Sequence, residues 1–417
     1  MRILFLTQII PYPPDAGPKV KTWHVLRYLV DRGHEVILAS FVRAEEQIHV
    51  KTLQELCTEV HTVPIVRSRL MDAKYWLRSH ITSRPFLIER DDISAMRKLV
   101  SQQLATESID VIHADQLTMT QYAFSYEGSN NHLPYTVFDA HNAVWTIVER
   151  MQENVNVYLK PVMKLEAGRI KRYEGMVVEK FDHTLAVTEV DRQALLEAWN
   201  TYIDSPSVGG ERQNADQAPR ITTYPITVDT EQLAPIDRQA GSKNIMTMGT
   251  LHYPPNADGV RWFVREVFPL ISKRVTEATL TIVGKNPPQD LIQLAAKESP
   301  RIIITGYVPD LKPYMEAAAL IAVPVRAASG MRVRILEAFA RSMPVVTTTV
   351  GLEGIDAHIG EDVLVQDTSA GFASAIVQLL KDEALQAQLA TNGRRIAQNR
   401  HDWKTGLKGL ENIYECE

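Results

Sequence analysis

Short apolar runs recur along the whole chain, and each is followed by a polar loop or by a stretch with helical spacing of its apolar positions. In the first half the apolar runs lie at Arg2–Leu6, Glu35–Ala39, Ile109–Ala114, Tyr135–Phe138, Leu185–Thr188 and Ile221–Tyr224. Short runs that are mostly apolar are typical of parallel strands buried on both faces. The stretches 19–31 and 191–199 between them have helical periodicity, and 149–178 is expected to be a long helical region. This alternation predicts a doubly wound α/β sheet.

The same alternation begins again in the second half. Its apolar runs lie at Asn244–Met248, Thr279–Val283, Arg301–Thr305, Leu320–Val323, Val345–Thr348 and Val363–Val365. A chain of 417 residues exceeds what one hydrophobic core comfortably supports. We therefore predict two Rossmann-like domains, residues 1–232 and 233–399, with a final helical segment at 400–417.

Composition narrows the class of protein. Hydrophobic residues make up 45% of the chain and charged residues 23%, as in ordinary water-soluble proteins. A net charge of −5 argues against a nucleic-acid partner. The two cysteines, Cys57 and Cys416, imply no disulfide framework and favour a reducing, cytoplasmic compartment. No apolar run approaches the roughly 20 residues that cross a bilayer, and 1–10 is expected to be a buried strand rather than a leader.

A mixed basic and apolar stretch, Val66–Arg97, has two interpretations. Its arginines and lysine alternate with Leu70, Trp76, Leu77 and Phe86, a composition that can dock on anionic lipid. The same pattern occurs on solvated helix faces, and acidic residues dilute its charge. Peripheral membrane contact and a plain surface helix both remain open.

The stretch 324–344 predicts a phosphate site. An apolar strand leads into a small-residue turn, and good helix formers follow over Met331–Arg341. Unpaired N–H groups and the helix dipole favour an anion there, and Gly330 lets it approach the backbone. Arg332 and Arg334 add positive charge. Glu337 lies seven residues after Gly330, almost two helical turns on and so on nearly the same face, and its carboxylate suits ribose hydroxyls. The alternative is an ordinary strand, turn and helix whose arginines face solvent.

His141 is the first catalytic candidate, because it follows an expected strand at the edge where open α/β sheets bind ligands. The alternative is that His141 and Asp139 cap the next helix. His113 and His183 are interpreted as structural.

Five motifs in the second half resemble those of family-4 glycosyltransferases, which are retaining, nucleotide-sugar-dependent enzymes with the GT-B fold. They are M-G-T-L-H-Y-P-P-N-A-D-G-V-R-W-F at 248–263, L-T-I-V-G at 280–284, I-T-G-Y-V-P-D at 304–310, S-G-M-R-V-R-I-L-E-A-F-A at 329–340 and P-V-V-T-T-T-V-G-L-E-G at 344–354. The resemblance implies two Rossmann-like domains around a central cleft, with the last helix crossing back to the first domain. The donor motif resembles the subset with G-x-R-x-[KR]-x-L-E.

The resemblance also implies roles for individual residues. Donor contacts are expected from Gly17, Gly249, Thr250, Asn256, Val308, Ser329, Gly330, Met331, Val333 and Glu337, with His141, Arg332 and Arg334 as the catalytic set. Several positions depart from the family pattern. Thr250 and Pro255 stand where many relatives have a cation, Ser329 replaces the first of two glutamates, and Ala16 replaces the first glycine before Gly17.

The expected function is transfer of a hexose-type sugar from a nucleoside-diphosphate sugar to a hydroxyl of a saccharide or lipid-linked acceptor. The resemblance places this in cell-envelope polysaccharide or glycolipid synthesis, in the cytoplasm or at the inner membrane face. No D-x-D motif occurs, so neither a catalytic metal nor another cofactor is expected. A nucleotide-sugar 2-epimerase of the same fold and a non-catalytic sugar-nucleotide-binding partner subunit are the alternatives.

Overall fold

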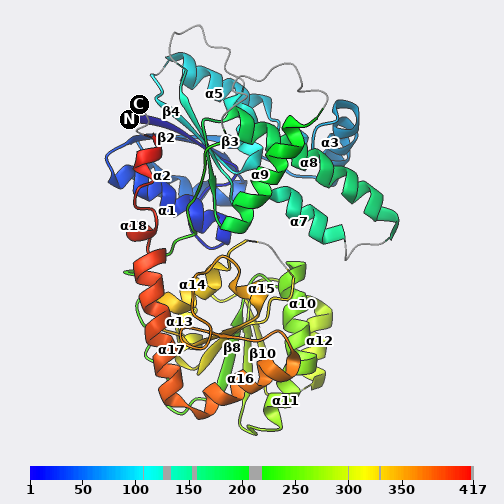
Figure 1. Ribbon diagram of the computed structural model, residues 1–417, viewed down its shortest axis with the longest axis vertical. Coiled ribbons are helices and arrows are strands. Elements are labelled where there is room, and N and C mark those ends of the chain that lie inside the picture. Colours follow the sequence, from blue (N-terminus) through cyan, green and yellow to red (C-terminus); the bar gives the residue numbers. More distant parts are fainter. Residues whose placement is uncertain are drawn as a thin grey trace. The chain divides into compact units, whose positions relative to one another are not determined.

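The computed structural model describes residues 1–106, 108–124, 133–152, 157–205, 218–298, 300–327 and 330–414. The chain forms two compact α/β units (Figure 1). Unit 1 comprises Met1–Pro225 and Leu407–Glu417, and unit 2 comprises Ile226–Gly406. The final segment of the chain therefore belongs to the same unit as the first strand.

Unit 1 is built on a parallel sheet of seven strands in the order β3-β2-β1-β4-β5-β6-β7. The strands are β1 Arg2–Thr7, β2 Glu35–Val42, β3 Glu59–Pro64, β4 Val111–Asp115, β5 Tyr135–Asp139, β6 His183–Ala186 and β7 Ile221–Thr223. Strand β3 was not predicted, because it lies at the edge of the sheet and is mostly half-buried. Its polar side chains interrupt the apolar signal on which the prediction rested.

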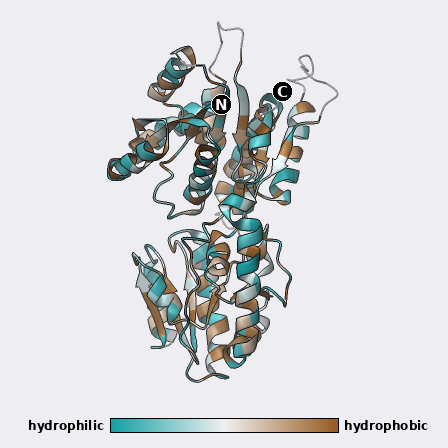
Figure 2. Cartoon of the chain, turned by 90° about the vertical axis from the view of Figure 1, so that its left-hand side faces the viewer, coloured by the Kyte–Doolittle hydropathy of each residue, from teal (hydrophilic) through white to brown (hydrophobic). Residues whose placement is uncertain are grey.

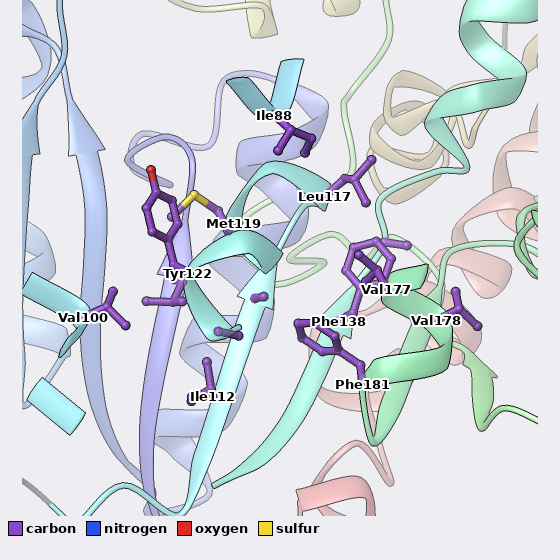
Figure 3. Close-up of a cluster of buried hydrophobic side chains, with 14 of the residues drawn as sticks. Ile88, Val100, Ile112, Leu117, Met119, Tyr122, Phe138, Val177, Val178 and Phe181 are labelled. Atoms are coloured by element: carbon purple, nitrogen blue, oxygen red, sulfur yellow. The ribbon is translucent and has the colours of Figure 1, made fainter. Parts of the chain in front are cut away.

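Helices cover both faces of this sheet. The helices of unit 1 are α1 Gly17–Asp31, α2 Val50–Leu56, α3 Arg69–Thr82, α4 Phe86–Arg90, α5 Ser94–Thr106, α6 Thr120–Ala123, α7 Val144–Met151, α8 Lys160–Lys180, α9 Glu189–Ile203 and α19 Glu411–Tyr414. Figure 3 shows part of the core between sheet and helices, where Phe138 of β5 lies near Val177 and Phe181, and Ile112 of β4 belongs to the same cluster. The burial of these apolar side chains is the main force that holds the layers together.

Unit 2 has a parallel sheet of six strands in the order β10-β9-β8-β11-β12-β13. The strands are β8 Asn244–Met248, β9 Thr279–Val283, β10 Ile302–Gly306, β11 Leu320–Val323, β12 Val345–Thr347 and β13 Leu364–Val365. The helices are α10 Pro254–Trp262, α11 Phe268–Ser272, α12 Gln289–Glu298, α13 Lys312–Glu316, α14 Val333–Ala340, α15 Thr349–Leu352, α16 Ser369–Lys381, α17 Glu383–Ile396 and α18 Trp403–Gly406. Most helices carry hydrophilic and hydrophobic residues side by side, as expected for helices that pack one face on a sheet (Figure 2).

Two predicted helices are divided in the structure. The expected long helix at 149–178 consists of α7 and α8, with residues 153–156 between them outside the described part. The final helical segment is broken between α18 and α19, where Gly409 has a left-handed backbone with φ of +90°. Such a backbone conformation cannot continue a helix.

A buried glutamate of α8 caps α7. The Glu174 carboxylate accepts the backbone N–H groups of Val144 at 2.7 Å and Trp145 at 3.0 Å, at the start of α7. Burial raises the pKa of Glu174 to about 8; its two N–H bonds oppose that rise, and Asp191 adds to it. The neutral acid is therefore favoured in the folded state at pH values where the unfolded chain is ionised.

This cap predicts a pH-dependent stability. Because the folded pKa lies above the unfolded value, the contribution of Glu174 is complete below about pH 4.5 and is lost as the pH rises through about 8. The free energy of unfolding of the wild type should fall between pH 5 and pH 9. This fall should be larger than the fall in Glu174→Gln by on the order of 2–5 kcal/mol. Urea denaturation across this range measures the difference. The exposed Glu149→Gln, on α7, is the control and should retain the wild-type slope; parallel curves for wild type and Glu174→Gln would refute the assignment.

Candidate functional site

The strand order of unit 2 creates a switch point between β8 and β11. Strands β9 and β10 continue from β8 to one side of the sheet, and β12 and β13 continue from β11 to the other. In open parallel sheets, ligands bind outside the carboxyl ends of the strands at such a point. Here the loop that begins with Gly249 follows β8, and the loop that leads to α14 follows β11.

The start of α14 differs from the prediction by two residues. The expected helix begins at Met331, but α14 begins at Val333, because Arg332 has an extended backbone with φ of −92° and ψ of 91°. No side chain caps this helix. Gly330 has a left-handed backbone with φ of +77°, and a side chain there would meet nothing within 4 Å. The turn therefore selects glycine by its backbone conformation and leaves open space beside the helix start.

Arg334 ties this helix to the end of β8. Its Nη1 donates to the carbonyl oxygen of Met248 at 2.8 Å, and its Nη2 donates to Oδ1 of Asn256. Asn256 in turn donates to the carbonyl oxygen of Thr250 at 3.0 Å. Both acceptors of Arg334 are uncharged, so these bonds hold its guanidinium in place, and the nearby carboxylate of Glu337 offsets part of its charge.

Arg332 and Arg334 form a concentrated positive charge. Arg332 is only 8% exposed. Burial and the nearby charge of Arg332 lower the pKa of Arg334 to about 10. Two guanidinium groups at an uncapped helix start raise the local positive potential and favour an anion. This arrangement can therefore bind a phosphate or diphosphate group.

Gly249 permits the close approach of Arg334. Its backbone φ is +156°, and a Cβ atom at this position would lie 2.5 Å from Nη1 of Arg334. Any larger residue would push the guanidinium away from Met248. The absence of a side chain at Gly249 thus lets Arg334 pack against the end of β8, in addition to any contact of Gly249 with a ligand.

Glu337 lies one turn after Arg334 on α14, at the spacing that places both on the same face of the helix. Burial raises the pKa of Glu337, although Arg341 and Arg334 oppose this shift. The prediction derived the position of Glu337 from helical spacing to Gly330. That derivation was wrong, because Gly330 precedes the helix; the spacing that holds is the one to Arg334.

The remaining predicted residues of unit 2 are dispersed. Val308 lies two residues after β10 and is half-buried. Because β9 separates β10 from β8, Val308 is at the same edge of the sheet but two strands from Gly249. Met331 is buried and Val333 is the first residue of α14. Ser329 lies outside the described residues.

The carboxyl edge of the unit 1 sheet has a second polar cluster. Thr7, Asp115 and Asp139 end the adjacent strands β1, β4 and β5 and are register partners. The Asp115 carboxylate accepts the hydroxyls of Thr7 at 2.8 Å and Thr22 at 3.0 Å. His141 Nε2 lies 2.7 Å from Asp115 Oδ1. The buried carboxylate therefore orients the His141 ring.

The alternative role of His141 and Asp139, capping the next helix, is wrong. The Glu174 carboxylate takes the first N–H groups of α7, and Asp139 instead forms a fully buried ion pair with Lys21. Burial disfavours the Asp139 carboxylate, but Lys21, His113 and His141 outweigh this and hold its pKa well below the usual range. Gly17 is the first residue of α1, the helix that brings Lys21 and Thr22 to the strand ends.

His113 connects this cluster to the end of the chain. Its Nε2 lies 3.6 Å from Asp139 Oδ2, and its Nδ1 lies 2.7 Å from the hydroxyl of Tyr414 on α19. His113, Asp115 and Asp139 also offer ligand atoms within 4.8 Å of one another, a spacing that a metal ion could use. The ammonium group of Lys21 already provides a cation at Asp139.

The sequence prediction missed Asp115, Lys21 and Thr22. Asp115 had a usable signal, since it directly follows the predicted strand Ile109–Ala114, at the strand end that also made His141 a candidate. Lys21 and Thr22 had none, because they lie within a helix whose pairing with strands about a hundred residues away depends on the folded sheet.

Comparison with a family model identifies part of the chain. Residues 242–382 match the model described as "Glycosyl transferases group 1". A curated protein of Klebsiella pneumoniae, described as an uncharacterized 44.6 kDa protein in the cps region, is 20% identical over 417 residues, which cover 97% of each chain.

Solved structures share the fold over the full length. HepE of Anabaena, in complex with UDP and glucose, has a TM-score of 0.66 at 15% identity and covers 99% of this chain and 98% of its own. Sucrose-phosphate synthase of Thermosynechococcus elongatus has a TM-score of 0.67 at 14% identity, with coverage of 99% and 98%. A TarM variant of S. aureus, in complex with fondaparinux, alpha-GlcNAc-glycerol and UDP, has a TM-score of 0.66 at 13% identity and covers all of both chains. The predicted GT-B fold, with two parallel-sheet domains, is confirmed.

Proposed function

We propose, from the glycosyltransferase group 1 domain at residues 242–382, that the protein transfers a hexose-type sugar from a nucleoside-diphosphate sugar to a hydroxyl acceptor. The observation on which this proposal depends is the uncapped start of α14, where Arg332 and Arg334 concentrate positive charge at the switch point of the unit 2 sheet. A departing diphosphate is the anion that this arrangement suits.

The chemistry of the proposed step explains why fixed charge matters. When the bond between sugar and phosphate breaks, negative charge grows on the diphosphate. The N–H groups at the start of α14 and the two arginines are already in place, so they stabilise this charge without reorganising. In the same proposal Glu337 binds the ribose and backbone atoms near Val308 bind the base. Gly249 and Thr250 line the diphosphate side, with Ser329 near the transferred sugar.

Unit 1 is assigned the acceptor side and His141. A hydrogen bond from Nε2 to Asp115 fixes one tautomer of a neutral His141 ring and leaves Nδ1 for a sugar oxygen. We propose retention of anomeric configuration by attack of the acceptor on the same face of the sugar. This route needs neither a protein nucleophile nor a metal ion, and Lys21 beside Asp139 is consistent with it.

The setting follows from the relatives. HepE and the TarM variant were solved with UDP and with sugar ligands, and the Klebsiella relative lies in a cps region. These observations support a nucleotide-sugar donor and a saccharide or lipid-linked acceptor in cell-envelope polysaccharide synthesis. We place the protein in the cytoplasm or at the inner face of the membrane.

A panel of donors tests the proposal. UDP-, GDP- and ADP-sugars are titrated by calorimetry, and the products formed with saccharide acceptors are identified by mass spectrometry. We expect one nucleotide to bind and its sugar to appear on an acceptor, or as free sugar by slow hydrolysis. Isomerised donor without transfer would instead indicate a 2-epimerase. Binding without turnover would indicate a non-catalytic partner, a result that the missing cations at Thr250 and Pro255 would explain.

A further inference from the structure

Helix α3 in unit 1 is exposed on almost every side. Among its fourteen residues only Ser79 is buried. Its exposed side chains include large apolar ones, with Leu70 86% exposed, Ile81 78% and Leu77 59%. A water-soluble helix normally buries such a stripe against the core. This helix therefore presents apolar surface that the described part of the chain does not cover.

A second apolar stretch lies beside it. Tyr158 is 86% exposed, just before α8, and Val162 and Leu165 are exposed on the first turns of α8. The two helices are adjacent, since Arg169 of α8 donates to the hydroxyl of Ser79 in α3 at 3.3 Å. Figure 1 shows α3 and α8 next to each other in unit 1. We call the exposed side chains of residues 66–81, 151 and 157–165 the α3–α8 surface.

This surface concentrates the exposed apolar residues of the protein. More than half of the large apolar side chains that are exposed in the described residues belong to it. They are Val66, Leu70, Met71, Trp76, Leu77, Ile81, Met151, Val157, Tyr158, Leu159, Val162 and Leu165. Scattered exposed apolar residues are ordinary, whereas a gathering of this size marks an interaction site.

The charge of the same region is positive although the chain as a whole carries −5. Residues 157–172 contain five basic side chains and one acidic side chain, and α3 contains three basic and one acidic. Some of these cations have acidic partners, since Arg78 pairs with Glu89 and Lys171 pairs with Glu197. The exposed cations that remain include Arg69, Lys74, Lys160 and Lys164. The single acidic residue of the first stretch, Glu166, accepts the backbone N–H of Phe86 at 2.5 Å. Burial raises the pKa of Glu166, although its bond to Phe86 and the charge of Arg169 oppose this shift.

We propose that the α3–α8 surface docks on an anionic membrane. Basic side chains beside apolar ones match a layer of negative headgroups above an apolar interior. Trp76 and Tyr158 are side chains that favour the membrane interface. A second copy of this chain would instead bring like charges together. No described helix is long and apolar enough to span a bilayer, so the contact is interfacial.

Vesicle binding tests this proposal without any use of transfer activity. The purified full chain is sedimented with vesicles of phosphatidylcholine alone and with vesicles that contain phosphatidylcholine and phosphatidylglycerol in equal parts. We expect binding to the anionic vesicles only, and weaker binding as the salt concentration rises. The triple variant Leu70→Ser, Leu77→Ser and Tyr158→Ser should lower the partition coefficient at least about tenfold.

The matched control is the double variant Ile48→Ser and Ile359→Ser, whose residues are 78% and 64% exposed outside this surface. It should bind vesicles as wild type does. All the replaced side chains are exposed, so circular dichroism and thermal melting should show folded proteins throughout. Equal binding by the triple variant, no binding to anionic vesicles, or self-association that disappears in the triple variant would overturn the proposal. Because no donor is present, none of these results depends on the glycosyltransferase activity.

Discussion

Replacing Arg332 by alanine is expected to slow sugar transfer on the order of a hundredfold or more. Arg332 is buried at the start of α14, where its charge adds to that of Arg334. If a diphosphate leaves at this point, the variant loses one fixed positive charge that acts most strongly in the transition state. Steady-state kinetics with the donor identified by the panel measures the change in kcat and in kcat/KM.

Two further variants separate charge from geometry. Arg332→Lys retains the charge but loses the planar pair of donors, so its activity should lie between that of wild type and alanine. Arg274→Ala, an exposed arginine of unit 2 that bonds Ser374, is the control and should leave the kinetics unchanged. An Arg332→Ala enzyme with wild-type kcat/KM would mean that the diphosphate does not leave beside α14.

Replacing Lys21 by methionine is expected to destabilise the protein by about 3–5 kcal/mol. Lys21 is 2% exposed and pairs with the fully buried Asp139. Methionine fills a similar volume but leaves the Asp139 carboxylate without its main opposite charge. Urea denaturation at neutral pH, followed by circular dichroism, measures the loss.

The double variant Lys21→Met and Asp139→Asn tests the reason for that loss. It removes both charges, so the free energy of unfolding should recover by much of the amount that Lys21→Met loses. The exposed pair of Lys404 and Glu231, 2.7 Å apart in unit 2, is the control, and Lys404→Met should change stability by less than about 1 kcal/mol. A small effect of Lys21→Met, or a further loss in the double variant, would contradict a buried ion pair at the end of β5.

The strands could be predicted where both faces of a strand are buried. Strands β8, β9 and β11 begin and end at the predicted residues, because most of their residues are apolar and nearly all are buried. Strand β3 was missed because its edge position leaves polar side chains in the sequence. The local sequence pattern therefore predicts buried strands well and predicts edge strands poorly.

The start of α14 shows a different limit. Met331 and Arg332 have good helix propensity, yet α14 begins only at Val333, the backbone of Arg332 is extended, and Arg334 bonds the carbonyl of Met248 at the end of β8. That tertiary contact overrides the local preference. The turn at Gly330 could be predicted from the strand-to-helix pattern, because a turn between a strand and a helix depends on neighbouring residues in the sequence.

The polar cluster of unit 1 depends on contacts between distant residues. Lys21 with Asp139, His141 with Asp115, and His113 with Tyr414 each join separate elements. The neighbours of each residue in the sequence do not distinguish it from other polar residues. Only the register of β1, β4 and β5 brings the carboxylates together. A single sequence could indicate His141 by its place after a strand, but not the carboxylate that orients it.

Calorimetric titration of nucleoside diphosphates tests the central claim most directly. UDP, GDP and ADP are each compared with their own nucleoside on wild type and on Arg332→Ala. If the start of α14 binds the diphosphate, one diphosphate should bind wild type at least about tenfold more tightly than its nucleoside. This difference in affinity should become smaller as the salt concentration rises. It should largely disappear in Arg332→Ala. A diphosphate that binds no more tightly than its nucleoside, or equally well to both proteins, would contradict the account.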